Sequence, residues 1–557
     1  MAYLETGAPG ADELLFLPLG GTGEIGMNLN LYGHDGAWLM VDCGITFGDD
    51  TTPGIEVILP DPAFIEERKN DLVGIVLTHA HEDHLGALPY IWKRFPVPVY
   101  ATPFTAAFLK RKLVETGLQD KVPIRIIPMS GRVHIAPFEI ELITLTHSIP
   151  EPNAVFVRTP AGTVLHTGDW KLDPDPVVGE TTDEKRLIEI GREGVLAMVC
   201  DSTNAMVPGH SGSEADVADV LADVFDRLDQ RIVVGCFASN VARIESIAKA
   251  ARAVGREVAL VGRSLWRIHD AAKETGYLKD CPRFLSDDEA KRLPRDRVVL
   301  ICTGSQGEPR AALTRIAEDQ HPAISLQAGD AVIFSSREIP GNERAIGRLQ
   351  NKLATLGVSI ITARDEEIHV SGHPARDELS QMYQWVRPRI SIPVHGEARH
   401  LKAHAELAKS CQIPFTLVAR NGDVIRLDAQ DGPEVIDEVY AGRLALDGKR
   451  LTAFDSDAIK GRRKLSFNGS VVVTAVVDGR GRLLKDPQLS APGLAADEAD
   501  ELIDDLLDVV EDALEGAEGR KNIDDAALAE IIRRAVRRAA QELTGKRPPT
   551  DVHLVRI

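Results

Sequence analysis

Residues 77–88 read LTHAHEDHLGAL and directly follow the apolar run LVGIV at 72–76. Three histidines and two acids fall within positions 79–84. Imidazole nitrogens and carboxylate oxygens are the usual ligands of zinc and similar divalent ions. A solvated turn after a strand does not need this dense combination, so the stretch predicts a metal site at the end of a strand. Its candidate ligands are His79, His81, Asp83 and His84.

Five other short apolar runs also end in a residue suited to metal binding or proton transfer. These residues are Asp42, His147, Asp169, Asp201 and His395. In layered α/β folds ligands gather at strand ends, because the loops there converge from a rigid sheet. Each residue alone would more often be structural. The cluster at 79–84 supplies too few ligands for two metal ions. These five residues therefore become candidates for the same site.

Bulk composition describes an ordinary globular chain. The 557 residues suggest two to four domains, and 44% are hydrophobic and 27% charged. Neither a secretory signal nor an apolar run of about 20 residues is evident. The six cysteines are scattered without a C-x-x-C pair, which is typical of a reducing compartment. We therefore expect a cytoplasmic protein that does not span a membrane.

The net charge of −20 at first argues against nucleic acid as a partner. Residues 497–518, however, contain eleven acidic residues and no basic one. The remaining chain is only mildly acidic, and basic side chains could still line a local groove. Charge alone therefore excludes neither RNA nor DNA.

Residues 21–26, GTGEIG, fit the G-x-G-x-x-G pattern of dinucleotide-binding proteins, and Asp42 follows 21 residues after Gly21. That function requires a helix after the glycines. The next residues, MNLNLYGHDGAWLMVD, predict instead a strand, a turn and a second strand. We expect the glycines to form a tight loop beside the site.

The pattern of elements divides the chain into parts. Between about residues 213 and 361, helical and strand patterns alternate as in a parallel α/β domain. The C-terminal part reads as a hairpin, an acidic helix, a basic helix and a final strand. We predict domain segments 1–212, 213–362 (inserted), 363–433 (return), 434–465 (linker) and 466–557 (C-terminal).

The motif H-x-H-x-D-H, with the acids and histidines upstream and downstream of it, resembles the metallo-β-lactamase superfamily. The long stretch between Asp169 and His395 resembles the inserted domain of the β-CASP nucleases. The segments GGTGEIGMN, THSIPE, HTGDWKLD, FASN, TGSQGEP, HVSGHP and PVHGE resemble the ribonuclease J family over about residues 12–430. The resemblance implies an α/β protein: a four-layer αββα metallo-β-lactamase fold, an inserted parallel α/β β-CASP domain and a small α+β C-terminal domain.

The resemblance also implies roles for single residues. One zinc would be bound by His79, His81 and His147, and the other by Asp83, His84 and His395, with Asp169 bridging. The implied cofactor is two Zn²⁺ per subunit, with Mn²⁺ or Mg²⁺ possible in assays. Asp83, Asp201 and His373 would be catalytic, the last two by proton transfer to the leaving 3′-oxygen. Asp42 would support the site through hydrogen bonds.

Two further segments suit a phosphate group. Residues 369–373, HVSGH, combine hydroxyl, backbone N–H and imidazole donors, and Ser239-Asn240 opens a helix whose N-terminus favours anions. A plain helix N-cap is the alternative for Ser239-Asn240. The resemblance implies a pocket for a terminal 5′-monophosphate, formed by Ser239, Asn240, His369, Val370, Ser371, Gly372 and His373.

The implied activity is a metal-dependent ribonuclease. It would be a 5′→3′ exonuclease that prefers 5′-monophosphate ends, with endonuclease activity, in RNA decay and in rRNA and mRNA 5′-end maturation. The implied partners are single-stranded RNA, a second or further copies in a homodimer or homotetramer, and an RNA-degradation complex. The alternatives are a non-catalytic RNA-binding subunit of such a complex, a DNA nuclease of the same group, or a hydrolase of small esters.

Two charged groups lie outside the predicted site. Four arginines at helical spacing, Arg533, Arg534, Arg537 and Arg538, could touch RNA. We expect them instead to pair with the acidic helix or to serve a subunit interface. Asp49 and Asp50 could hold a peripheral cation, but a solvated loop is the favoured interpretation.

Overall fold

The computed structural model describes residues 8–49, 51–339, 341–494, 499–517 and 523–557. The chain forms two compact units. Unit 1 comprises Met1–Thr46 and Ile58–Leu444, and unit 2 comprises Phe47–Val57 and Ala445–Ile557. Asp50, one of the two acids considered for a peripheral cation, lies outside the described residues. The Asp49 carboxylate accepts hydrogen bonds from the backbone and hydroxyl of Thr51, as in an ordinary turn.

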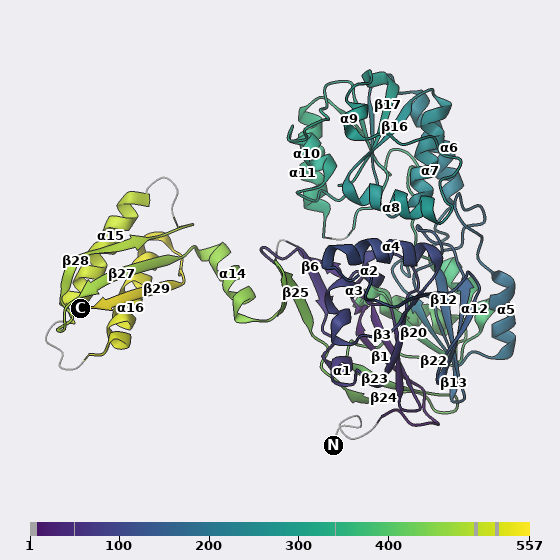
Figure 1. Ribbon diagram of the computed structural model, residues 1–557, viewed down its shortest axis with the longest axis horizontal. Helices are drawn as coiled ribbons and strands as arrows, with labels where there is room; N and C mark the ends of the chain where they lie inside the picture. Colours follow the sequence, from purple (N-terminus) through teal and green to yellow (C-terminus); the bar gives the residue numbers. More distant parts are fainter. Residues whose placement is uncertain (1–7, 50, 340, 495–498, 518–522) are drawn as a thin grey trace. The chain divides into compact units, whose positions relative to one another are not determined.

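Two large sheets form the body of unit 1 (Figure 1). The first runs in the order β24 (Gly432–Glu438), β23 (Asp423–Asp428), β1 (Leu15–Gly20), β3 (Leu29–His34), β4 (Ala37–Val41), β7 (Leu72–Val76), β8 (Val99–Ala101) and β9 (Ile124–Ile126). The second runs in the order β10 (Arg132–Ile135), β11 (Phe138–Thr144), β12 (Asn153–Thr159), β13 (Gly162–His166), β14 (Ala197–Asp201), β20 (Ile390–Val394) and β22 (Phe415–Thr416).

The inner faces of both sheets share one hydrophobic core. Phe16 and Val76 of the first sheet belong to the same buried cluster as Val157 and Ile392 of the second. Helices cover the two outer faces because each sheet must bury its second apolar face as well. These helices are α4 (Pro103–Leu113) beside β8 and β9, and α5 (Glu184–Glu193), α12 (Arg376–Val386) and α13 (Ala398–Ser410) over the second sheet. The predicted αββα layering is confirmed.

Strand direction explains where the site forms. In the first sheet β4, β7 and β8 are parallel, and in the second β13, β14 and β20 are parallel. The carboxyl ends of parallel strands meet at one edge of a sheet. The chain leaves these strands at the residues predicted to form the site, namely Asp42, His79, Asp169, Asp201 and His395.

The inserted domain is a five-stranded parallel sheet, as the alternating pattern predicted. Its order is β16 (Glu257–Val261), β17 (Val298–Cys302), β15 (Ile232–Gly235), β18 (Ala331–Phe334) and β19 (Ser359–Ile361). Helices α6 (Glu214–Asp226) and α7 (Val241–Ala253) lie on one side and α10 (Ala312–Ala317) and α11 (Glu343–Thr355) on the other (Figure 1). Short elements complete unit 1: β2 (Thr22–Gly23), α1 (Ala63–Glu67), α2 (Glu82–Leu85), α3 (Leu88–Ile91), α8 (Arg263–Glu274), α9 (Asp287–Ala290) and β21 (Gly396–Glu397).

The segment 434–465, expected to be a linker, carries regular structure. It contains most of β24, all of β25 (Arg443–Asp447) and β26 (Arg450–Ala453), and the start of α14 (Asp457–Asn468). Among the described strands β24 pairs with β23 alone, and six of its seven residues are exposed or half-buried, so its residues are polar enough to look like a linker in the sequence. Two further short strands, in the same sheet as β25 and β26, are β5 (Thr46–Phe47) and β6 (Val57–Pro60). The exact domain limits remain predictions.

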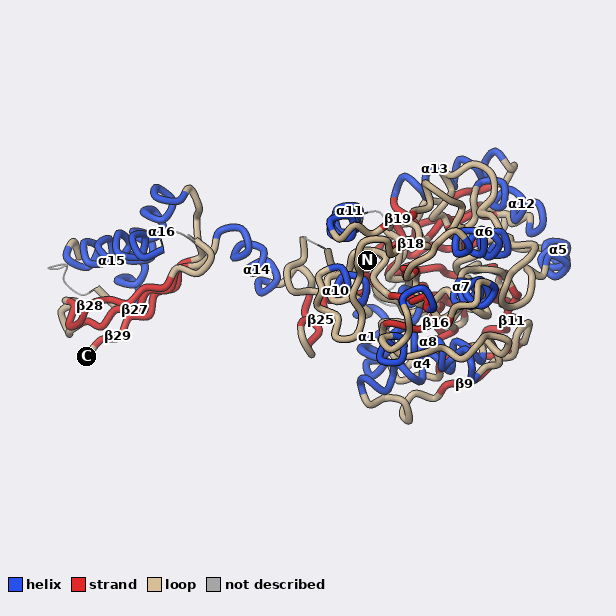
Figure 2. The backbone as a smooth tube through the Cα atoms, turned by 90° about the horizontal axis from the view of Figure 1, so that it is seen from above, coloured by secondary structure: helices blue, strands red, loops and turns tan. Residues whose placement is uncertain are grey.

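Unit 2 contains the predicted α+β domain. Strands β28 (Leu483–Ser490), β27 (Val471–Val477) and β29 (Thr550–Arg556) form one sheet, and α15 (Ala499–Glu515) and α16 (Asp525–Thr544) lie on one side of it (Figure 2). β27 alternates buried and half-buried residues, as a sheet with one covered face requires. Arg533 and Arg534 form ion pairs with Glu530 of their own helix, so the expected pairing with the acidic helix is wrong for these two.

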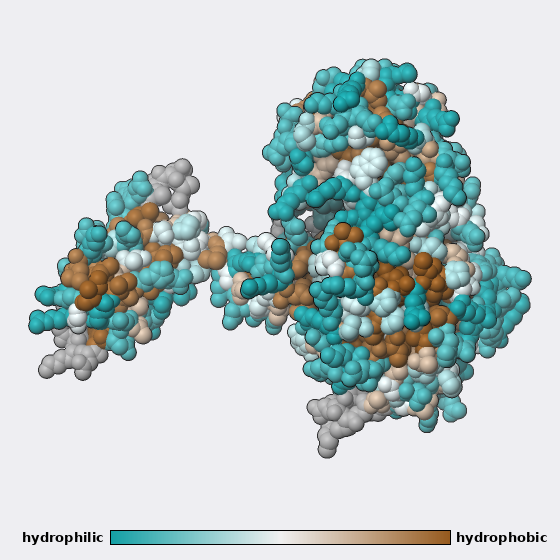
Figure 3. Space-filling view, viewed as in Figure 1, coloured by the Kyte–Doolittle hydropathy of each residue, from teal (hydrophilic) through white to brown (hydrophobic). Residues whose placement is uncertain are grey.

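The visible surface is mostly hydrophilic, and apolar side chains gather in patches on both units (Figure 3). Within the described ranges, none of the helices combines the length and apolar character that crossing a bilayer requires.

Candidate metal centre

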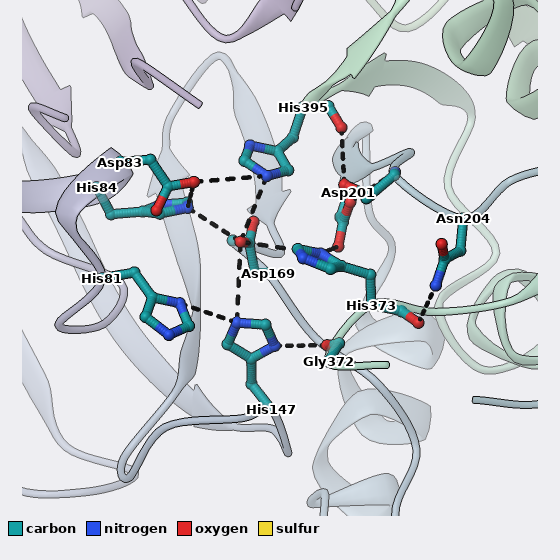
Figure 4. Close-up of polar contacts among 12 residues, drawn as sticks. His81, Asp83, His84, His147, Asp169, Asp201, Asn204, Gly372, His373 and His395 are labelled. Atoms are coloured by element: carbon teal, nitrogen blue, oxygen red, sulfur yellow. Dashed lines mark hydrogen bonds and ion pairs between the residues drawn. The ribbon is translucent and has the colours of Figure 1, made fainter. Parts of the chain in front are cut away.

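The structure brings together all seven residues predicted as metal ligands. One group contains His79, His81, His147 and Asp169, and another contains Asp83, His84, Asp169 and His395. Within each group one ligand atom per residue lies within 4.8 Å of every other. Asp169 belongs to both groups and lies between them (Figure 4).

Close backbone approaches make this convergence possible. A Cβ added at Gly44 would lie 1.6 Å from the carbonyl oxygen of Asp83, and one at Gly168 would lie 2.8 Å from Cβ of Thr78. Asp42 and His395, directly after β4 and β20, have φ angles of 65° and 52°. Residues other than glycine rarely adopt this left-handed backbone conformation. It costs on the order of 1 kcal/mol, and such residues cluster at functional sites.

In the first group, an outer partner holds each imidazole so that its other nitrogen faces the centre. Nδ1 of His147 donates to the carbonyl of Gly372 at 2.5 Å. Nδ1 of His79 lies 2.9 Å from Thr78 Oγ1, and Nε2 of His81 lies 3.0 Å from Ser239 Oγ. The inward nitrogens of His79 and His147 lie 3.0 and 3.1 Å from Nδ1 of His81. Three nitrogens thus point at one position.

The second group follows the same plan. Nδ1 of His84 lies 2.7 Å from the Asp42 carboxylate, while its Nε2 lies 3.1 Å from Asp169 Oδ2 and 3.6 Å from Asp83 Oδ2. Nδ1 of His395 contacts the Asn28 side chain, and its Nε2 lies 3.5 Å from Asp169 Oδ2. Such outer hydrogen bonds fix the orientation and tautomer of metal-binding histidines.

The protonation of these groups fits divalent cations. Burial lowers the pKa of His79 and His147 well below the usual value and that of His81 to about 4, so these rings are neutral. Burial opposes charge on Asp169, but His395 and His84 hold its pKa well below the usual value. Neutral imidazole and ionised carboxylate are the forms that bind metal.

Unpartnered atoms support the same conclusion. Asp169 Oδ1 and His395 Nε2 are buried and have no hydrogen-bond partner among the described residues. Burial opposes protonation of His84, yet Asp169, Asp83 and Asp42 raise its pKa well above the usual value. A centre that attracts a proton so strongly has excess negative charge, which bound cations would neutralise.

Asp201 and His373 form a pair beside the ligands. Nδ1 of His373 lies 2.8 Å from Asp201 Oδ2, and its ring stacks on that of His395 with centroids 5.6 Å apart. Burial opposes charge on His373, but Asp201 raises its pKa to about 9. Nδ1 of His373 also lies 3.9 Å from Asp169 Oδ2. The predicted proton-transfer pair is therefore in contact with the centre (Figure 4).

The predicted phosphate-binding residues lie against the same centre. Residues 369–373, the 369–373 loop, pass over His147, since a Cβ at Gly372 would lie 2.7 Å from Cε1 of that ring. Ser371 Oγ accepts hydrogen bonds from Asn204 Nδ2 at 2.7 Å and from the His373 backbone at 3.2 Å. Nδ1 of His369 is buried without a hydrogen-bond partner in the described part of the chain.

The other predicted pocket residues serve mainly structural contacts. Asn240 caps α7 through its carbonyl oxygen, which accepts from the Arg243 backbone, and its amide donates to Glu214 at 3.2 Å. A Cβ at Gly212 would lie 2.8 Å from Val370 Cγ1, so this valine packs closely on that glycine.

Sequence reasoning missed the outer partners Asn28, Thr78 and Asn204. Asn28 lies two residues after the glycine motif. Strand β3, not a helix, begins at the next residue, so the dinucleotide-binding alternative is wrong. The motif forms a loop beside the site, where the Gly21 carbonyl accepts a hydrogen bond from the backbone of His395. The position of Asn28 within a quoted family segment was the available signal, whereas Thr78 and Asn204 had none beyond adjacency to a strand end.

Family models match successive parts of the chain. The metallo-β-lactamase superfamily matches residues 26–198, and the β-CASP domain of ribonuclease J matches 229–353. An RNA specificity domain of zinc-dependent metallo-hydrolases matches 357–414, and the ribonuclease J C-terminal domain matches 457–557. A ribonuclease J of Sinorhizobium meliloti is 48% identical over 552 residues, with 98% of both chains covered. The chain belongs to the ribonuclease J family.

Other relatives agree with this assignment. A ribonuclease J of Mycolicibacterium smegmatis is 40% identical with 98% of both chains covered. One from Thermus thermophilus is 37% identical, with 84% of this chain and 82% of the relative covered. A crystal structure of an Enterococcus faecalis protein of unknown function is similar with a TM-score of 0.52 and 15% identity, covering 74% of this chain and all of that one, which supports the fold alone.

Proposed function

We propose that this protein is a metal-dependent ribonuclease that binds two zinc ions and degrades RNA from the 5′ end. The observation that carries the proposal is the convergence of six candidate ligands on the seventh, Asp169, with the 369–373 loop directly against them. His79, His81 and His147 would hold one ion and Asp83, His84 and His395 the other, with Asp169 between them. Bound zinc ions would activate water and stabilise charge on the scissile phosphate.

The residues around the ions would position and protonate the substrate. His373 is held by Asp201, and its other ring nitrogen is available to donate a proton to the leaving 3′-oxygen. Asp42 would keep His84 in the tautomer that presents Nε2 to the centre. Water enters this scheme as the nucleophile, so no covalent intermediate on the protein is needed.

Two serines are suited to bind a terminal 5′-monophosphate. Ser371 Oγ already accepts two hydrogen bonds, so its hydroxyl hydrogen is left for an anion. His81 presents Nδ1 to the centre, so its Nε2–H donates to Ser239 and likewise leaves the Ser239 hydroxyl hydrogen. A pocket next to the metal centre would place the first phosphodiester bond at the ions, which gives 5′→3′ exonuclease activity with 5′-monophosphate preference.

The proposal extends to endonuclease activity and to action in RNA decay and in rRNA and mRNA 5′-end maturation. It also includes assembly as a homodimer or homotetramer within a degradation complex. These extensions rest on the similarity of this chain to the two ribonucleases J of Sinorhizobium meliloti and Mycolicibacterium smegmatis. Cytoplasmic location belongs to the same extension.

The test uses one RNA labelled at its 3′ end and carrying a 5′-monophosphate, 5′-triphosphate or 5′-hydroxyl group. Each RNA, and a DNA of the same sequence, is incubated with the protein and with an Asp83→Ala, His84→Ala variant. We expect release of mononucleotides from RNA, fastest from the monophosphate and absent in the variant. Internal cuts at a rate that does not depend on the 5′ group would contradict the proposed recognition of the RNA 5′ end, here called end reading. Faster cleavage of DNA would favour a DNA nuclease, and no cleavage by the zinc-loaded protein would favour a non-catalytic subunit.

A further inference from the structure

The proposed phosphate pocket needs positive charge, and the charge of His373, one of its own residues, is already paired with Asp201 at 2.8 Å. A terminal phosphate carries a charge of about −1.5 to −2 at neutral pH. Ser239 and Ser371 offer only hydroxyl groups, and burial followed by nearby cations keeps the pKa of His369 well below the usual value, so its ring is neutral. The cations that oppose protonation of His369 are Arg243, Arg337 and Lys171.

Two of these three cations are already neutralised. The Arg243 guanidinium is fully buried and binds both carboxylate oxygens of Glu214 at 3.1 and 3.2 Å. Lys171 Nζ lies 2.8 Å from Asp173 Oδ2 and donates to the Gly212 carbonyl. Ion pairs of this kind contribute little net field at a neighbouring site, because the opposite charges cancel beyond a few ångströms.

Arg337 is the cation left over. It follows β18 on an exposed loop, and no carboxylate of the described residues lies within 4.0 Å of its guanidinium. Its Nη1 donates to Asn204 Oδ1, and Asn204 Nδ2 donates to Ser371 Oγ at 2.7 Å. The guanidinium therefore lies one amide group away from the proposed phosphate donor, with N–H groups still available.

The loop that carries Arg337 is held in place from beneath. Gln306 is only 4% exposed, and its amide donates to the Arg337 carbonyl at 2.8 Å while its carbonyl accepts from the Ile339 backbone at 2.9 Å. Large apolar side chains are exposed on this loop and on the loop after β14 that carries Asn204. They are Ile339, which is 43% exposed, and Met206, which is 51% exposed. A fixed backbone with an uncompensated arginine and exposed apolar neighbours is typical of a binding rim.

We propose that Arg337 is a specificity-determining residue that binds the terminal 5′-phosphate of the RNA and sets the preference for monophosphorylated ends. The inference rests on the end-reading activity proposed above. Arg337 supplies the positive charge, and the Ser239 and Ser371 hydroxyls, which are neutral donors, supply further hydrogen bonds to the phosphate oxygens. Arginine suits this task because its planar N–H groups match phosphate oxygens.

The experiment compares kcat/KM for RNAs that differ only in a 5′-monophosphate or a 5′-hydroxyl group. For Arg337→Gln we expect the monophosphate-to-hydroxyl ratio to fall about 10- to 100-fold, as loss of a charge-assisted hydrogen bond predicts. The rate on the hydroxyl RNA should stay within about twofold, since that substrate lacks the bound group. Arg337→Lys should keep part of the preference. A nucleoside 5′-monophosphate should inhibit the wild type more strongly than the nucleoside, and Arg337→Gln should remove the difference.

Arg227→Gln is the matched control, because Arg227 is an exposed arginine of the same inserted domain whose charge is paired with Glu366 at 2.6 Å. An unchanged ratio in Arg337→Gln would overturn the inference. An equal loss on both RNAs would also overturn it, since Arg337 would then act through Asn204 or an internal phosphate. Cleavage by the wild type without any preference would contradict the proposed end reading itself, and with it this inference.

Discussion

The metal centre and the 369–373 loop lie against each other but are built differently. In the centre, each histidine uses one nitrogen for an outer partner and turns the other inward. In the loop, the polar groups are shared: the Gly372 carbonyl orients His147, and Ser371 is held by Asn204. The centre thus contains all seven candidate ligands, whereas the loop both supports one of them and forms a proposed binding surface. Substitutions in the loop must therefore be separated from metal loss by measuring metal content.

The largest loss of activity without loss of metal is expected from His373→Gln. Removing a proton donor should lower kcat on RNA about 10²- to 10⁴-fold. Zinc content should not change, because in the proposed scheme His373 binds Asp201 and not an ion. His134→Gln, at an exposed histidine of β10, is the control and should retain full activity. A parallel loss of zinc would instead assign His373 to the ligands.

Asp42→Asn tests how far the centre depends on its outer partners. The change keeps the size of the side chain but removes the carboxylate that holds His84 at 2.7 Å. We expect zinc affinity to fall about 10- to 100-fold, with activity restored by excess zinc. Competition with a chromogenic chelator measures the affinity. Unchanged affinity would mean that the Asp42 carboxylate does not contribute to zinc binding.

Ser371→Ala should have a smaller effect and should act mainly on the 5′-monophosphate RNA. Losing one hydrogen bond of about 1 kcal/mol predicts about a fivefold lower kcat/KM. Zinc content measured on the same preparation separates the two roles of the loop. If zinc falls together with activity, the loop supports the centre and the pocket assignment loses its argument.

Glu141→Gln lies outside both regions and should affect stability only. The Glu141 carboxylate contacts Arg186 and Arg158, both at 2.7 Å, and Arg132 at 3.0 Å. Burial opposes its charge, but these arginines lower its pKa to about 2. At pH 7 the free energy of unfolding of the variant should be lower by about 1–2 kcal/mol. Solvent screening of the exposed arginines keeps this difference small.

The sign of its pH dependence follows from that lowered pKa. Because the folded pKa lies below the unfolded one, the contribution of Glu141 is present above about pH 4.5 and is lost as the pH falls towards 2. Urea unfolding of both proteins between pH 3 and 7 should therefore show a difference that shrinks with acid. A difference that stays constant would contradict the charge-based account.

The metal ligands were predictable because they follow short apolar runs, and parallel strands bring such positions to one edge. The parallel α/β inserted domain followed from the alternation of helix and strand patterns, whereas the order of the strands in the sheets was not predicted. The roles of Asn28, Asn204 and Arg337 were not predicted, because Asn28 contacts His395, and Asn204 contacts Ser371 and Arg337, across more than a hundred residues of sequence. The edge strand β24 has few apolar residues, which is why its sequence resembles that of a linker.

The most direct test of the metal centre is the zinc content of the wild type and of Asp169→Asn, measured by mass spectrometry of the metal after equilibration with zinc and gel filtration. We expect about two zinc ions per wild-type chain, and loss of at least one of them in the variant together with a fall in RNA hydrolysis of about 1,000-fold or more, since Asp169 is the ligand common to both groups. A wild type without zinc, or a variant with full zinc and full activity, would contradict the assignment of this cluster as the catalytic metal centre.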